Sequence, residues 1–400
     1  MGNEDANAKT MKRKVFYIPG FDPMPPRRYR ELYRREGQKQ ASISGYTLEQ
    51  GFCPKAGTSG WHITAHMDEG TAKTDFECLI WADIVKASMK PSFWNIYIRS
   101  FINYSNYITS GALRRITRVR FGPAVVALYP PIITLIQLLL GLLIMAGMFS
   151  LFSSFHAILG VLFALGAGIG WFYLMRRFDR GLFAHYLMLD YSYYAADRGA
   201  LPGTLDARLD QFTIKVLDAL KADYDEVLIV GHSSGVQLAI NVAARVLRWD
   251  KKRFEKLGLL TLAHSVPMTS FMPKAQYMRR DMLDLADYKK LMWLDVSAPG
   301  DGACFALADP VAISGVSPEK SFNPKILSAS FSKTLSEEQK QKLRGRFFKK
   351  HFQYLCAFEN PGQYDYFALT AGPQPFQKRI AGLKESPSKI TTIYSHYTDV

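Results

Sequence analysis

The pentapeptide Gly231-His232-Ser233-Ser234-Gly235 has the residue types and spacing from which nucleophilic chemistry can be built. A serine at the apex of a sharp turn that opens a helix exposes its Oγ above the positive end of that helix. Side chains two residues away on either side would collide in such a turn, so glycine is needed at both places. Because five residues match this pattern by chance in many chains, the flanking segments decide its meaning.

These flanking segments have the periodicities of a strand and a helix. The continuous apolar run at 227–230 predicts a buried strand, and the residues after Gly235 are apolar at helical spacing. Strand, tight turn and helix together predict a nucleophile elbow with Ser233 as the nucleophile and Gly231 and Gly235 as its glycines. The alternative is a plain strand-to-helix turn in which a serine caps the helix.

The strand, Gly-x-Ser-x-Gly turn and helix resemble the α/β-hydrolase superfamily of serine esterases, lipases and thioesterases. The resemblance covers about residues 13–60 and 185–375 but not the middle of the chain. It implies an α/β fold with a mostly parallel sheet and flanking helices. It also implies a triad in the chain order nucleophile, acid, histidine, and neither a metal nor an organic cofactor.

The resemblance places the acid in a loop after a late strand. Residues 289–296 are expected to form such a strand and 297–302 to turn after it, so Asp301 is the first candidate. Its task would be to orient an imidazole and stabilise the imidazolium. Asp295, inside the strand, is the second candidate and Asp309 the third.

The histidine of the triad is expected after the last strand, predicted at 325–331. His351 satisfies the order Ser233, Asp301, His351, although a helical segment at 336–350 stands where a short loop is more usual. His396 also follows Asp301 but lies four residues from the end of the chain, where fraying is expected. His264 precedes the acid at the end of a predicted strand, and we interpret it as structural.

A second glycine turn follows a predicted strand near the start of the chain. Lys14 to Ile18 reads as a strand, and Pro19 to Pro23 turns after it. The superfamily places half of its oxyanion hole in such a turn, because backbone N–H groups must point at the developing oxyanion. By resemblance the donors are the amides of Phe21 and Ser234; the alternative is a simple turn.

The middle of the chain has a membrane-like composition. The segments at about 124–148 and 157–175 are apolar and uncharged, and each reaches or approaches the roughly 20 residues that cross a bilayer. They predict a transmembrane hairpin; a buried core hairpin or a membrane-dipping lid is the alternative. Small residues at Gly166 and Gly170, and at Ala164 and Gly168, offer faces for close helix packing.

Arginine residues flank this hairpin on both sides, while the turn between the helices carries no charge. By the positive-inside rule both flanks lie in the cytoplasm. We therefore expect an integral protein of a cytoplasmic membrane whose catalytic domain faces the cytoplasm. The arginines are Arg114, Arg115, Arg118, Arg120, Arg176, Arg177 and Arg180.

Length and charge agree with this organisation. The chain has 400 residues and a net charge of +15, which suits nucleic acid, an anionic membrane or acidic substrates. No zinc-finger spacing, aromatic RNA-binding signature or long basic block supports nucleic acid. His62 and His66 lack a supporting ligand set, so no metal site is expected. The domains are predicted as 1–60 and 185–400 for the hydrolase parts, with an insertion at 61–184.

Together these features predict a membrane-anchored serine hydrolase that cleaves an ester through an acyl-enzyme. A membrane tether and a basic chain favour a lipid or other amphiphilic ester as the substrate. Two alternatives stay open. One is an acyltransferase with the same triad, and the other is a non-catalytic membrane-tethered scaffold or binding module on the same fold.

Overall fold

The computed structural model describes residues 10–53, 59–89 and 93–400, which form an α/β fold around one mixed eight-stranded sheet. In space the strands run β2-β3-β4-β1-β5-β6-β7-β8. Strands β4, β1 and β5 to β8 are parallel, whereas β2 and β3 continue antiparallel from β4. Their bounds are β1 (Met11–Ile18), β2 (Thr47–Gly51), β3 (Gly60–Met67), β4 (Gly70–Cys78), β5 (Glu226–His232), β6 (Leu257–Leu262), β7 (Met292–Ser297) and β8 (Lys325–Ser328).

The central strands are apolar on both faces, as expected for parallel strands covered on both sides by helices. In β1, Phe16 and Ile18 belong to one buried cluster, and Val15 and Tyr17 belong to the other. Neighbouring β5 alternates in the same way over its fully buried length. The predicted α/β fold with a mostly parallel sheet is confirmed.

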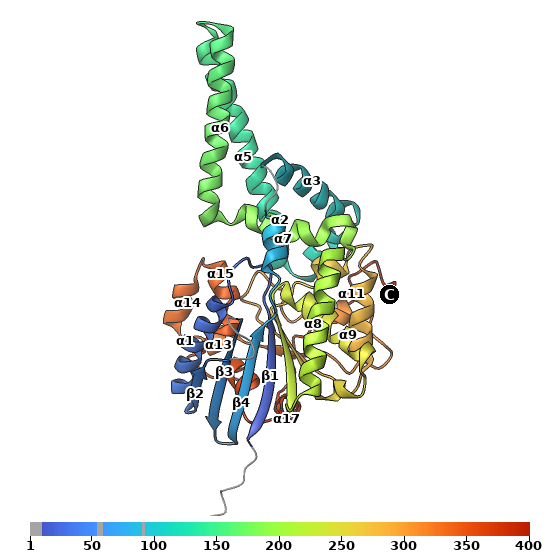
Figure 1. Cartoon of the computed structure of the whole chain (residues 1–400). Helices are drawn as coiled ribbons and strands as arrows, with labels where there is room; N and C mark the ends of the chain where they lie inside the picture. The colour runs from blue at the N-terminus through green and yellow to red at the C-terminus, as the bar shows by residue number, and fades with distance from the viewer. Residues whose placement is uncertain (1–9, 54–58, 90–92) are drawn as a thin grey trace, which may run out of the picture.

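Helices cover both faces of the sheet (Figure 1). One face is covered by α8 (Gly203–Lys221), α9 (Gly235–Trp249), α10 (Pro267–Ser270), α11 (Gln276–Asp287), α12 (Pro310–Ile313) and the turn η3 (Arg253–Lys256). The other is covered by α1 (Arg27–Ser44), α13 (Phe331–Thr334), α14 (Glu337–Leu343), α16 (Tyr366–Ala371), α17 (Phe376–Gly382) and the turn η4 (Gln353–Leu355). The short helix α15 (Phe347–His351) lies between α14 and η4.

Strands β1 and β5 lie side by side, but the helices that follow them pack on opposite faces of the sheet. Helix α1 follows β1 on one face, and α9 follows β5 on the other. In open α/β sheets a crevice forms at the carboxyl ends of two such strands, and ligands bind there. The predicted elbow and the predicted oxyanion turn therefore meet at the position where a site is expected.

The helical insertion begins later than the sequence analysis places it. Residues 61–78, assigned there to the insertion, form most of β3 and all of β4, which pair with each other and with β1. The helices start after Cys78. They are α2 (Ala82–Ser88), α3 (Phe93–Thr109), α4 (Ala112–Val119), α5 (Phe121–Ser153), α6 (Ala157–Leu182) and α7 (Ala184–Ala195), followed by the turn η2 (Ala196–Gly199).

Helices α5 and α6 form a hairpin that projects from the body (Figure 1). Phe121–Ser153 and Ala157–Asp179 are each long and apolar enough to cross a membrane. In the most apolar 18-residue stretch of each helix, only 17% is buried inside the protein. Most of their apolar side chains therefore have no protein neighbour to cover them in this chain.

Only one of the two small faces predicted on α6 packs against α5. A Cβ added at Gly168 would lie 2.6 Å from the sulfur of Met145 on α5. Ala164, one turn earlier, is buried. Gly166 and Gly170 have no neighbour within 4 Å of an added Cβ, so the prediction of a packing face there is wrong. They lie on a different side of the helix from Gly168, because two residues rotate a helix by about 200°.

Candidate active site

Ser233 lies between β5 and α9 in the strand-turn-helix arrangement that its neighbours predict. Its backbone has a φ of 58°, in the left-handed region that L-residues other than glycine seldom adopt. Its amide donates to the carbonyl of Leu262 at the end of β6, which helps to hold the turn (2.9 Å). A strained, half-buried serine at the carboxyl end of a sheet has the geometry that the predicted nucleophile elbow requires.

Both elbow glycines are required by close packing. A Cβ at Gly235 would lie 2.4 Å from the carbonyl oxygens of Ile18 and Pro19, where β1 ends. A Cβ at Gly231 would lie 2.7 Å from the Cβ of Ala239 on α9. The elbow is thus pressed between its own helix and the turn after β1.

Asp301 and His351 form a buried pair at the same end of the sheet. His351 Nδ1 lies 2.7 Å from Asp301 Oδ2, and their side chains are 8% and 2% exposed. Because a carboxylate can only accept, Nδ1 carries the hydrogen and Nε2 keeps a lone pair available for a proton. Asp301 also accepts hydrogen bonds from the amide of Ala303 (3.0 Å) and the hydroxyl of Tyr354 (3.2 Å).

Burial alone would raise the pKa of Asp301. The attraction of His351 and its hydrogen bond, with that from Ala303, outweigh burial and hold the pKa below its usual value. Asp301 is therefore a carboxylate at neutral pH. An ionised acid on Nδ1 is what an imidazole needs in order to act as a general base through Nε2.

His232, the residue before the serine, connects the elbow to the helix that holds His351. Its Nε2–H donates to the backbone carbonyl of His351 at 3.0 Å, and the two rings are 5.0 Å apart. Burial lowers the pKa of His232 to about 3, so its ring is neutral. The sequence analysis gave His232 no role, because the middle positions of Gly-x-Ser-x-Gly are unrestricted in the pattern.

Within the described part of the chain, Ser233 Oγ has no hydrogen-bond partner. Through His232, the structure brings the elbow and the Asp301–His351 pair together at one end of the sheet. The hydrogen bond from a catalytic serine to its base often tightens only in the substrate complex.

The predicted oxyanion donors lie together, but one of them is engaged. The amide of Phe21 donates to the side-chain Oγ of Ser234 at 2.8 Å. The carbonyl of Phe21 accepts a hydrogen bond from the hydroxyl of Tyr186 on α7. Ser234 is the N-cap residue of α9, so its amide lies at the positive end of that helix. Phe21 can bind an oxyanion only after the Ser234 hydroxyl moves aside.

The other two acid candidates have structural partners. Asp295 lies inside β7 and accepts a hydrogen bond from the hydroxyl of Thr261 (2.7 Å), and burial raises its pKa to about 8. Asp309 caps α12 by accepting from two backbone amides, and it forms an ion pair with Lys389 (3.2 Å). Among the described residues, the acid bonded to His351 is Asp301.

The other histidines considered in the sequence analysis are also placed away from this pair. His264 Nε2 donates to the carbonyl of Ala308 (2.9 Å), and burial lowers its pKa to about 4, in keeping with a structural role. His396 is exposed and contacts the ring of Tyr397. On β3, His62 pairs with Asp75 and His66 with Thr71. The described residues contain no cluster of metal-binding side chains.

Helix α7 lies over the elbow with one face toward it. The ring of Tyr186 lies 6.2 Å from that of Phe21, and the ring of Tyr193 lies 5.6 Å from it. Asp190 is one turn after Tyr186, and its buried Oδ1 has no hydrogen-bond partner among the described residues. Burial raises the pKa of Asp190 to about 7 in spite of the attraction of His351. The sequence analysis missed Asp190, whose only signal is a lone acid in a tyrosine-rich segment.

The acid loop, in turn, contacts the start of the hairpin. A Cβ at Gly122 on α5 would lie 2.9 Å from the Cα of Gly302, next to Asp301. The guanidinium of Arg120 donates to the carbonyl of Ala306 at 2.9 Å. The first turn of α5 is therefore fixed to the loop that carries the acid.

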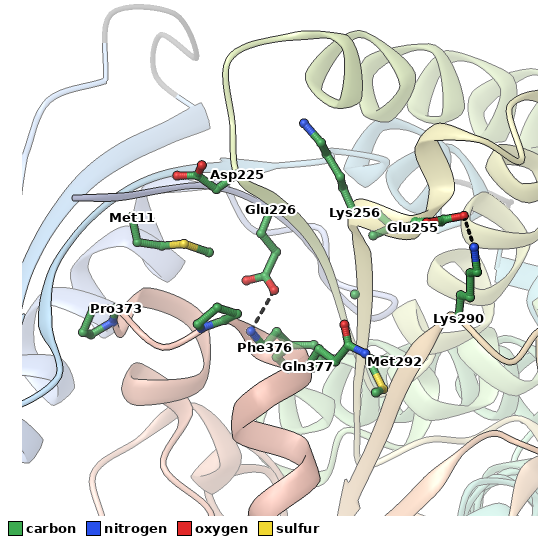
Figure 2. A pocket seen from close by; sticks show the side chains of 13 residues that line it. Met11, Asp225, Glu226, Glu255, Lys256, Lys290, Met292, Pro373, Phe376 and Gln377 are labelled. Atoms are coloured by element: carbon green, nitrogen blue, oxygen red, sulfur yellow. Dashed lines mark hydrogen bonds and ion pairs between the residues drawn. The ribbon is translucent and has the colours of Figure 1, made fainter. Parts of the chain in front are cut away.

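A pocket of about 450 Å³ lies at the opposite end of the sheet (Figure 2). It is lined by residues at the amino ends of four parallel strands, Met11, Glu226, Leu257 and Met292. Glu226 in this pocket accepts a hydrogen bond from the amide of Phe376 (2.7 Å) and pairs with the buried Arg13 (2.6 Å). This glutamate has structural partners, and the pocket is separate from the Ser233 turn.

Comparisons of the chain with protein-family models, with curated proteins and with solved structures found no match. The family resemblance therefore rests on the residues and geometry described above.

Proposed function

We propose that this protein is a membrane-anchored serine hydrolase of the α/β-hydrolase type, which cleaves a lipid or other amphiphilic acyl ester. The observation that carries the proposal is the buried His351–Asp301 pair (2.7 Å) at the same sheet end as the strained Ser233. A carboxylate that orients an imidazole, and a serine for that imidazole to activate, are the parts of an acyl-transfer triad.

In the proposed reaction, His351 Nε2 takes the proton from Ser233 Oγ as that oxygen attacks the ester carbonyl. Asp301, which is ionised, stabilises the imidazolium that forms. The amide of Ser234 binds the oxyanion, joined by that of Phe21 once the Ser234 hydroxyl turns away from it. The imidazolium then protonates the leaving alcohol, and water releases the acyl group by the reverse sequence.

The membrane part of the proposal rests on α5 and α6, two helices long and apolar enough to cross a bilayer. Arginines precede α5 and lie at the end of α6, while the turn between the two helices carries no charge, which favours a cytoplasmic position for the sheet domain. An enzyme held at a membrane surface meets amphiphilic esters at high local concentration. Location is thus the argument for a lipid-like substrate.

A non-catalytic scaffold is the second candidate, and one observation favours it. The Phe21 amide is satisfied by Ser234 Oγ, as in a turn that has only a structural role. The scaffold requires Ser233 to be unreactive, whereas the hydrolase requires it to be acylated.

The test is product analysis with the full-length protein in lipid vesicles, comparing wild type with Ser233→Ala on long-chain lipid esters and on short soluble esters. We expect fatty acid release from the lipid esters by the wild type alone. Activity on soluble esters without any on lipids would contradict the proposed substrate class. Transfer of the acyl group to an added alcohol, in place of acid release, would identify an acyltransferase.

A further inference from the structure

Helix α3 is held in a fixed orientation by one of its faces. The hydroxyl of Tyr104 donates to the carbonyl of Ala127 on α5 (3.1 Å). The hydroxyl of Tyr107, one turn later, donates to the carbonyl of Met268 (3.0 Å). Both tyrosines are buried, so the face of α3 opposite to them must point away from the body.

That outward face is apolar. Ile98, Phe101, Ile102 and Ile108 are 56%, 78%, 52% and 64% exposed, and their spacing places them along one side of the helix. We call these four residues the α3 stripe. A contiguous group of exposed large apolar side chains marks a surface that another apolar phase covers.

The chain around the stripe is basic and contains no acid. Residues 84–178 contain nine Lys and Arg residues and no Asp or Glu. Arg114 and Arg118 on α4, directly after α3, are exposed, and no described carboxylate pairs with them. A second copy of this chain would bring the same positive charge to the surface, so the charge favours an anionic covering layer.

Helix α3, which carries the stripe, lies beside the base of the hairpin (Figure 1). Helix α3 packs on α5 at Ala127. Phe121 and Val125 are exposed before this contact, and the long series of exposed apolar side chains on α5 follows it, from Ile132 and Leu135 onward. From Leu135 to the end of α5 there are 19 residues, which span about 28 Å and match the apolar thickness of a bilayer. If that part of α5 spans the membrane, α3 lies near the water–lipid boundary.

We propose that α3 and α4 form an in-plane lipid-binding platform on a bilayer that contains anionic lipid. The α3 stripe enters the boundary between headgroups and acyl chains, and Arg114 and Arg118 bind lipid phosphates. This inference rests on the proposed membrane anchoring. It also gives α3 a role in positioning the site. The side-chain amide of Asn106 on α3 donates to the carbonyl of Ala195 at the end of α7, the helix over Ser233 (3.0 Å). The platform therefore sets the distance between the site and the lipid surface.

The experiment uses full-length Ser233→Ala protein, so that no turnover is needed, with Cys356→Ser to remove the half-buried thiol. A fluorophore is attached at Ile102→Cys, at Ile214→Cys or at Leu143→Cys, in vesicles with lipids that carry a quencher on the acyl chain. Ile214 is the matched control, since it is 50% exposed on α8 of the body. Leu143, 68% exposed on α5, reports on the hairpin itself.

We expect quenching at position 102 to exceed that at 214 several-fold, with strong quenching at 143. Arg114→Gln with Arg118→Gln should reduce the quenching at 102 in vesicles with phosphatidylserine to the level found in phosphatidylcholine alone. Quenching at 143 but only control-level quenching at 102 would overturn the platform and leave the anchor intact. Control-level quenching at both positions would overturn the anchor as well.

Discussion

The ring of His232 donates its Nε2 hydrogen to the backbone carbonyl of His351 across 3.0 Å, joining residues 119 positions apart in the chain. The donor precedes the candidate nucleophile, and the acceptor belongs to the candidate base. The bond fixes the distance between the β5 turn and α15. With the Asp301–His351 pair, it constrains His351 at both its backbone and its ring.

Replacing this connection should slow the chemical step. In His232→Phe the carbonyl of His351 loses its buried donor, at a cost of about 1–3 kcal/mol in unfolding free energy. A small displacement of the imidazole should lower kcat by about 10- to 100-fold with little change in KM. Both constants would be measured on a lipid ester, with His264→Phe, a buried histidine bonded to the Ala308 carbonyl, as the control. Equal effects of the two substitutions on kcat would remove the positioning role of His232.

Comparing substitutions of two buried aspartates, Asp295 in β7 and Asp301 in the loop after it, can assign the acid. Asp301→Asn should reduce kcat by about 10²- to 10⁴-fold, because the amide cannot stabilise the imidazolium or fix the tautomer. Asp295→Asn should stay within about threefold of the wild type. Its pKa of about 8 makes it neutral at pH 7, and its partner is Thr261. If Asp295→Asn gave the larger loss, the assignment of the acid would be wrong.

The close approach of the two turns makes Gly235 sensitive to a single carbon atom. In Gly235→Ala the new Cβ would lie 2.4 Å from two carbonyl oxygens at the end of β1, so one turn must move. We expect a loss of about 2–4 kcal/mol in stability, together with loss of activity. Gly382→Ala on α17, which meets nothing within 4 Å, is the control and should be neutral or slightly stabilising. Denaturant titration of both variants measures the difference.

Asp190 should make stability depend on pH. Its pKa is raised from 3.8 to about 7 in the folded protein, so its contribution is fully present below about pH 4 and is lost as the pH rises through 7. Asp190→Asn imitates the neutral form and should be about 1–3 kcal/mol more stable than wild type at pH 8, with the difference vanishing near pH 4.

Thermal unfolding across this pH range checks the Asp190 prediction. The control is Asp287→Asn, which changes an exposed aspartate on α11. An Asp190→Asn variant that is less stable than wild type at pH 8 would show that the carboxylate is bound by a partner in the folded protein.

Local patterns were enough to predict the strand, turn and helix around Ser233 and the pair of apolar helices. An unbroken apolar run such as 227–230 and a helical repeat after Gly235 depend on neighbours in the chain. The order of Ser233, Asp301 and His351 predicted a pair that the structure brings into contact, because the carboxyl ends of parallel strands meet at one end of a sheet.

Features that depend on distant partners were not predicted. Strand β3 alternates buried Trp61, Ile63 and Ala65 with more exposed residues, and its position in the sheet is set by pairing with β4. The boundary of the insertion was therefore placed too early. The bond between the Phe21 amide and Ser234 Oγ joins residues 213 positions apart, and no periodicity in the sequence indicates it.

The central claim is that Ser233 is activated by His351, and labelling with a fluorophosphonate tests it most directly. The full-length protein in vesicles is compared with Ser233→Ala, His351→Ala and the neighbouring Ser234→Ala, which keeps its backbone amide. We predict labelling of the wild type and of Ser234→Ala, none of Ser233→Ala, and a strong reduction in His351→Ala. A folded wild type that is not labelled, or a Ser233→Ala variant labelled as well as the wild type, would contradict the proposed function.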